Sequence, residues 1–212
     1  MNTSTGMPDF TGNNAEWMSQ FSLPAEIEAQ SAALRKSITP RFSRITWSET
    51  VPDGRTVSII LDSQPDGLVR RLEDDGACKV QRVMIANEIP LLTAIDLTTA
   101  PIILQMLKTN LSFPLQQDQR YRLQSVSAGK TSNWLSLNDI VYKVTGSGDA
   151  SELNPALRGK YWRVECKEMS HADIGIKSTV AWLDDLQIFM HLDRIFDGEV
   201  QRFDWHNLKI SR

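Results

Sequence analysis

A carboxylate and an amine lie two residues apart in the segment Glu165-Cys166-Lys167, and this pair is the best candidate for enzymatic chemistry in the sequence. The surrounding residues alternate as in a β-strand, so Glu165 and Lys167 are expected to share one face. On such a face the carboxylate could bind a metal ion while the lysine orients a water molecule for attack. A second carboxylate would have to join the same metal site, and Asp139 and Asp149 are the candidates.

The predicted elements around this pair resemble the core of the PD-(D/E)xK nucleases. They are a helix over 99–109, three strands, a helix over 179–196 and a final strand. The resemblance covers about half of the chain. The sequence departs from the family in lacking a Pro-Asp step at the second strand, and in having a long loop over 146–159 where the family has a hairpin.

The resemblance implies a role for each residue of the candidate pair. Asp139 or Asp149 would provide the first metal ligand, Glu165 the second, and Lys167 would orient the attacking water. A Mg²⁺-dependent nuclease that binds nucleic acid is therefore one alternative function. No other catalytic or metal-ligating residues are predicted, and no cofactor.

Composition limits the remaining classes. The 212 residues include 23 basic and 26 acidic side chains, a net charge of −3, and the two signs are mixed along the chain. That balance gives no overall field to attract nucleic acid. No apolar run approaches the ~20 residues that cross a bilayer, and the first residues lack the features of a signal peptide. Cys78 and Cys166 form no CxxC motif, so we expect reduced thiols.

These observations predict a cytoplasmic protein, or one assembled into a virion in a host cytoplasm, with no membrane partner and no secretion through a signal peptide. They also predict an α+β fold. Residues 1–22 are a polar extended arm, and residues 23–212 are one compact domain with a possible sub-boundary near 86–98.

The first half of that domain is predicted to be a helix followed by an antiparallel meander. Pro24 suits the first turn of a helix that ends near Lys36. Three turns contain an Asp-Gly step or an Asp-Asp-Gly sequence, at 52–54, 65–67 and 74–76, which is typical of hairpins. The expected strands cover 41–49, 56–62, 67–73 and 77–85.

The second half is predicted to mix helices and strands. Residues 90–110 indicate one or two helices, and strands are expected near 119–126, 139–145, 160–168 and 199–210. The segment 179–196 is apolar around nearly its whole circumference. It is therefore predicted to be one long buried helix.

The third hairpin suggests a contact surface. If Glu73 pairs with Ala77, then Arg70 and Arg82 share an otherwise apolar face. Because an arginine cannot lose its charge on burial, each must meet a carboxylate, water or a partner. The large apolar side chains in the arm and one tryptophan in a polar segment also suggest contacts. The predicted interface residues are Met7, Phe10, Trp17, Met18, Phe21, Arg70, Arg82 and Trp134.

The leading interpretation is a non-enzymatic structural subunit of a larger complex, best matched by a virion component such as a phage connector, tail or baseplate protein. Its expected partners are protein subunits, either copies of itself or other assembly proteins. Besides the nuclease, the remaining alternative is an adaptor or regulatory binding module with a groove lined by Trp17 or Trp134.

Overall fold

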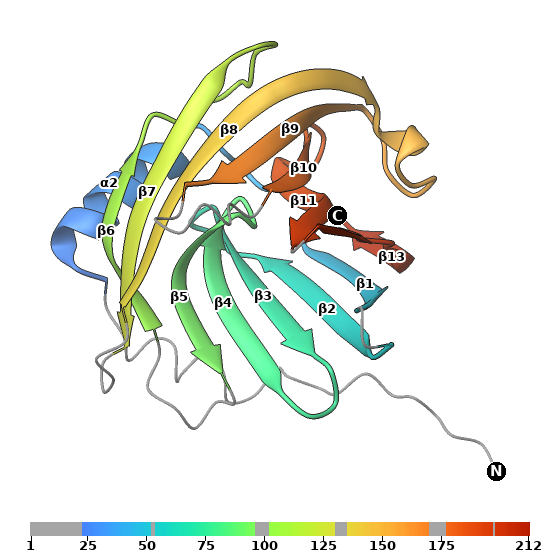
Figure 1. Cartoon of the computed structure of the whole chain (residues 1–212), viewed down its shortest axis with the longest axis horizontal. Coiled ribbons are helices and arrows are strands. Elements are labelled where there is room, and N and C mark those ends of the chain that lie inside the picture. Colours follow the sequence, from blue (N-terminus) through green and yellow to red (C-terminus); the bar gives the residue numbers. More distant parts are fainter. Residues whose placement is uncertain (1–22, 52–53, 96–101, 130–134, 170–176, 197) are drawn as a thin grey trace.

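Most of the described chain belongs to a single antiparallel sheet (Figure 1). A computed structural model of the whole chain describes residues 23–51, 54–95, 102–129, 135–169, 177–196 and 198–212. Within these ranges the sheet has 13 strands, accompanied by the helix α2 (Ala25–Arg35) and a 3-10 turn, η1 (Ala150–Glu152). The prediction of an α+β fold is therefore wrong.

In chain order the strands are β1 (Arg44–Thr50), β2 (Thr56–Ser63), β3 (Leu68–Asp74), β4 (Lys79–Ile85), β5 (Ile89–Ile95), β6 (Ile102–Thr109), β7 (Arg120–Gly129), β8 (Leu135–Asp149), β9 (Lys160–Glu168), β10 (Lys177–Leu183), β11 (Ile188–Phe196), β12 (Glu199–Arg202) and β13 (His206–Ser211).

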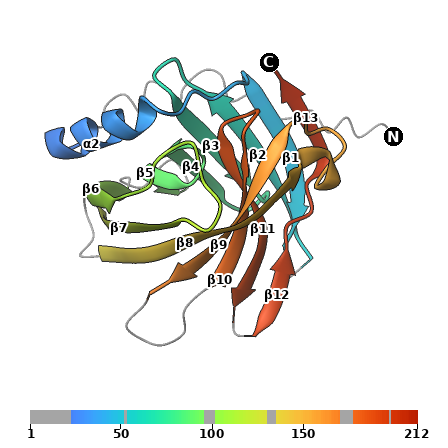
Figure 2. The ribbon, with the colours of Figure 1, turned by 90° about the horizontal axis from the view of Figure 1, so that it is seen from above.

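The sheet is a meander that returns to its beginning. Each strand from β1 to β11 pairs with the next one along the chain, and β13 then pairs with β1. The edge strands β12 and β13 are joined only by residues 203–205. Because so short a connection cannot cross a flat sheet of this width, the sheet must curl until its two edges approach, as Figure 2 shows.

The β10–β11 hairpin lies inside this curve (Figure 1), and the half next to its turn is buried on both faces. Val180 and Trp182 contribute to one core, which α2 also covers through Ile27. The intervening Ala181 and Leu183 contribute to a second core, which they share with β1, β2 and β3. The hairpin thus separates two apolar cores within one sheet.

The predicted helix over 179–196 is this hairpin, so that prediction is wrong. A strand buried on both faces has apolar residues at nearly every position, and over a short run this pattern cannot be distinguished from a buried helix. The chain reverses through Asp184–Gln187, where Gln187 takes a φ of 56°.

The helices predicted over 90–110 are also absent from the residues described there. Those residues form β5 and β6, which pair through Leu92↔Ile103 and Thr93↔Ile102. Isoleucine and threonine are enriched in strands, and that preference outweighs the weak helical spacing of the apolar residues. The single strand predicted over 199–210 is two strands, β12 and β13, at opposite edges of the sheet. By contrast, α2 and β1–β4 lie where the sequence placed a helix and four strands.

The third hairpin is offset from its predicted pairing. Glu73 pairs with Val80 rather than Ala77, because Asp75 accepts hydrogen bonds from the backbone N–H groups of Ala77 (3.0 Å) and Cys78 (2.7 Å) and so lengthens the turn. This offset of three residues reverses the face on which each β4 side chain lies. Arg70 and Arg82 therefore lie on opposite faces of the sheet.

Among the described residues, no helix combines the length and the apolar character that crossing a bilayer requires.

Candidate functional site

The structure separates the carboxylates of the predicted nuclease site. Glu165 and Lys167 are both exposed on β9. Glu165 pairs with Lys143 of β8. Asp139 lies four positions from Lys143 on the same strand, which is about 13 Å at ~3.3 Å per residue. Asp149 pairs with Lys160, which is about 16 Å from Glu165 in the other direction at the same rise per residue. Oxygen ligands lie ~2.0–2.6 Å from a metal, so neither aspartate can share one with Glu165.

Both aspartates have local structural roles instead. Asp139 accepts a hydrogen bond from Arg122 Nε (2.7 Å) and another from Gln124 (3.0 Å), and the arginine holds its pKa below the usual range. Asp149 caps η1 by accepting from the Ser151 backbone N–H at 2.9 Å. No group of three or more His, Cys, Asp or Glu side chains within the described ranges is placed to hold a metal ion. The arrangement therefore does not support the nuclease.

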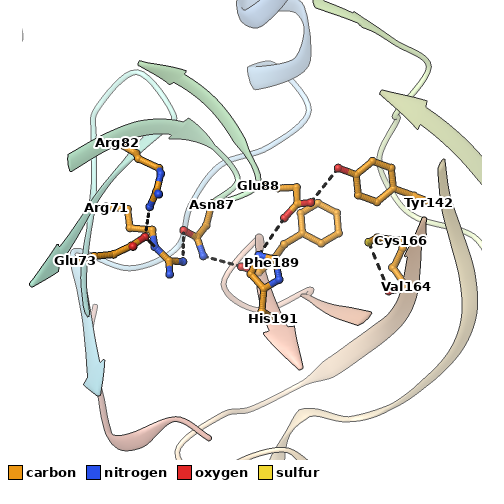
Figure 3. A network of polar contacts seen from close by, with 10 residues as sticks. All are labelled: Arg71, Glu73, Arg82, Asn87, Glu88, Tyr142, Val164, Cys166, Phe189 and His191. Atoms are coloured by element: carbon orange, nitrogen blue, oxygen red, sulfur yellow. Dashed lines mark hydrogen bonds and ion pairs between the residues drawn. The ribbon is translucent and has the colours of Figure 1, made fainter. Parts of the chain in front are cut away.

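Several groups with strongly shifted pKa values belong to a network of polar contacts inside the curled sheet (Figure 3). We call it the interior network, and it consists of Arg71, Glu73, Arg82, Asn87, Glu88, Tyr142 and His191. It begins on β3 and β4. Arg71 Nε donates to Glu73 Oε1 at 2.6 Å, and Arg82 donates to the same oxygen. Burial favours the neutral form of Glu73, but the two guanidinium groups hold its pKa below the usual value. Each of the two arginines singled out from the sequence therefore has a carboxylate partner. Arg82 pairs with Glu73, and Arg70 Nη2 lies 3.5 Å from Asp62 Oδ2.

The turn between β4 and β5 connects this ion cluster to the inner hairpin. Arg71 donates to Asn87 Oδ1 (3.3 Å), and the Asn87 side-chain amide donates to the carbonyl oxygen of Phe189 on β11 (2.9 Å). The Phe189 N–H in turn donates to the Ala86 carbonyl at 2.9 Å. Ala86 and Asn87 both have positive φ values, 52° and 59°, a conformation that asparagine tolerates better than most residues. The turn is therefore fastened to β11 by reciprocal hydrogen bonds.

Glu88 is the last residue of this turn, and its carboxyl group has a strongly raised pKa. The Tyr142 hydroxyl donates to Glu88 Oε1 at 2.9 Å, and the side chain of Glu88 is only 9% exposed. Burial raises the pKa of Glu88 to about 7, and the opposing effects of Tyr142 and Arg71 are smaller. At neutral pH the carboxyl group is therefore about half protonated.

His191 lies beside Glu88, with Nε2 3.8 Å from Oε2. Burial, followed by the nearby charges of Arg71 and Arg194, lowers the pKa of His191 to about 4. The imidazole still exposes 36% of its side-chain area, so water screens part of this effect. Since the imidazole is neutral at pH 7, its contact with Glu88 is not an ion pair.

Cys166 extends the buried surroundings of Tyr142. It is buried, and burial raises the pKa of its thiol well above the usual value, so little reactive thiolate forms. Sequence reasoning missed Glu88, Tyr142 and His191 because they come from three separate hairpins. The available signal was Glu88 itself, a single carboxylate within the apolar segment Met84–Leu92. The network joins β3–β5 to β8 and β11.

A second region lies on the outer face of β7–β11, and we call it the outer hollow. It has a volume of about 480 Å³ and includes the predicted residues Glu165 and Lys167. Its lining residues are Arg120, Val141, Lys143, Glu165, Cys166, Lys167, Met169, Lys177, Ser178, Thr179, Asp193 and Ile195. Charged side chains from β7 to β11 line the hollow, so its chemistry is that of a charged binding surface.

Large apolar side chains lie exposed on the same outer face. Leu137 is 68% exposed and Met106 is 43% exposed, and Val126 lies between them in the strand register. We call Met106, Val126 and Leu137 the outer strip. Met169 (48%) and Val200 (60%) are exposed further along the sheet.

Six of the predicted interface residues lie outside the described residues. They are Met7, Phe10, Trp17, Met18, Phe21 and Trp134. The structure therefore describes only Arg70 and Arg82 of that set, and both have carboxylate partners within the chain.

Comparison of the chain with models of known families, with characterised proteins and with solved structures gives no match.

Proposed function

We propose that this protein is a non-enzymatic assembly subunit that binds copies of itself through the outer strip. The observation that carries the proposal is the exposure of Leu137 beside Val126 and Met106 on three adjacent strands. Apolar side chains grouped on an exposed face are typical of protein interaction sites. Burying a leucine of this kind stabilises a complex by roughly 1.5–3 kcal/mol.

The position of the titratable groups supports a role without catalysis. Glu88 and His191, whose pKa values are strongly shifted, lie in the interior network, where Glu88 contacts both His191 and Tyr142. On the outer face, Glu165 is too far from Asp139 to share a metal ion. The exposed surface therefore offers contacts rather than reactive groups.

The kind of assembly stays a prediction from the sequence, which favoured a virion component such as a connector, tail or baseplate protein. The adaptor alternative depended on a groove lined by Trp17 or Trp134, and both residues lie outside the described ranges.

Sedimentation velocity of the full chain over roughly 1–50 μM, a range in which weak specific complexes form, tests the proposal. We expect species heavier than the 23.9 kDa protomer whose fraction increases with concentration. Leu137→Asp should shift the protein to the protomer, because it places a charge at the most exposed position of the strip.

Thr50→Asp is the matched control, since Thr50 is an exposed strand residue on β1, outside the strip. It should leave the sedimentation profile unchanged. Equal self-association of the Leu137→Asp and unmodified chains, or a protomer at every concentration, would contradict the proposal.

A further inference from the structure

We propose that the outer hollow binds the segment 1–22 of a second copy of this chain. This inference rests on the proposed function, because it supplies a second contact for the same self-association. Residues 1–22 lie outside the described residues, so their sequence and the geometry of the hollow carry the inference.

The hollow has an excess of positive charge. Arg120 pairs with Lys143 across β7 and β8, while Lys167 and Lys177 face each other across β9 and β10. The two acids of the lining are Glu165 and Asp193. Four cations against two acids leave a net charge of +2 in a chain whose total is −3.

One of these acids is already neutralised from outside the hollow. Arg163 Nη2 lies 3.4 Å from Asp193 Oδ2, and Arg163 does not line the hollow. By contrast, no ion pair between described residues engages the four cations of the lining. Elsewhere on the surface, arginines commonly have a carboxylate partner, as do Arg35, Arg44, Arg55, Arg122 and Arg212. The hollow therefore has charge available for an external acid.

Apolar side chains lie among these cations and restrict which kinds of ligand fit the hollow. Val141, Met169 and Ile195 line the hollow, and the last two are exposed. A ligand that covers them must present apolar groups between its acidic ones. Among the described lining residues there is no aromatic ring on which a nucleic-acid base could stack. This combination favours an acidic peptide with apolar residues.

The segment 1–22 has this composition. It contains Asp9 and Glu16 and no Lys, Arg or His, and Phe10 and Trp17 directly follow the two acids. Glu16 lies seven positions after Asp9, which is about 23 Å in an extended chain at ~3.3 Å per residue. The hollow spans β7 to β11, about 19 Å at ~4.8 Å between strands. Both carboxylates can therefore reach the basic lining from one extended segment that crosses the strands.

Binding of a fluorescent peptide with the sequence 1–22 tests the inference. The receptor is the full chain with Asp9→Lys and Glu16→Lys, so that its own segment does not compete. We expect saturable binding, and at least about tenfold weaker binding when Lys167→Glu and Lys177→Glu are added, because both changes put like charge opposite the peptide. Lys36→Glu with Lys209→Glu is the control of equal charge, since both lysines are exposed away from the hollow. It should change the affinity less than about twofold.

Three outcomes would overturn the inference. They are no binding of the peptide, equal binding by the Lys167→Glu/Lys177→Glu receptor, and binding of single-stranded DNA instead of the peptide with loss of that binding in the same variant. Failure here can be told apart from failure of the proposed function. Self-association that is sensitive to Leu137→Asp but unaffected by Lys167→Glu/Lys177→Glu would leave the outer strip as the contact and remove the hollow.

Discussion

The hairpin β10–β11 and the outer strands β6–β8 belong to one sheet but face different surroundings. Both sides of the inner hairpin are covered, so Val180 and Ala181 are equally buried although they point in opposite directions. The outer strands alternate, as in β7, where buried Tyr121 and Leu123 flank exposed Arg122. The turn half of the inner hairpin is therefore committed to holding the fold together. The outer strands have one face free for partners, as do the far ends of β10 and β11 that line the outer hollow.

The largest expected difference between the two regions is in packing. Phe189 of β11 is buried against Trp182, with ring centroids 4.9 Å apart. Phe189→Ala should reduce the free energy of unfolding by about 3–5 kcal/mol, because it leaves a cavity that the inner hairpin cannot close. At concentrations where the chain is a protomer, Leu137→Ala should change it by less than about 0.5 kcal/mol. Urea denaturation followed by tryptophan fluorescence measures both, and similar losses in the two variants would remove the distinction.

The loss of an ion pair should likewise cost more stability in the interior network than on the outer face. Glu73→Gln removes the carboxylate that Arg71 and Arg82 share, and it leaves two partly buried cations without their acid. We expect a loss of about 3 kcal/mol in the free energy of unfolding. Asp139→Asn breaks the pair with Arg122 on the outer face, where water replaces the lost contact, and its urea midpoint should hardly move. An equal shift in both midpoints would argue against the contrast.

The interior network also predicts how stability depends on pH. The folded pKa of Glu88 is about 7 against an ordinary 4.5, so the folded protein binds more protons between those values and loses stability as pH rises through them. The folded pKa of His191 is about 4 against 6.5, so stability is lost as pH falls through that window. The two slopes oppose each other between pH 4.5 and 6.5.

Single substitutions should therefore reveal each slope. In His191→Gln only the effect of Glu88 remains. The free energy of unfolding should then fall by about 3 kcal/mol as pH rises from 4.5 to 7, at ~1.36 kcal/mol per pKa unit. Glu88→Gln should leave the opposite and shallower slope of the partly exposed His191. Urea midpoints measured from pH 4 to 8 test both, and parallel profiles in the two variants would show that the groups do not titrate as the structure implies.

The same contrast explains how far the sequence could be interpreted. Turn residues such as Asp66-Gly67 act locally, so the first hairpins and α2 could be located from them. The β10–β11 hairpin could not, because burial of both faces removes the alternation that identifies a strand. The Asp184-Asp185 step, which begins its turn, was the only local signal of a reversal.

The candidate sites were also predictable only where they depend on residues close in sequence. Glu165 and Lys167 were found from their spacing and do lie together in the outer hollow, but the nuclease geometry required an aspartate that the strand register places far away. Glu88, Tyr142 and His191 meet only because the sheet curls, and no local spacing in the sequence records that closure.

The mass of the unmodified chain in solution tests most directly whether this protein is an assembly subunit. Mass photometry together with light scattering at higher concentration should give multiples of 23.9 kDa that increase as the protein is concentrated. A single species of 23.9 kDa across the whole concentration range would contradict it.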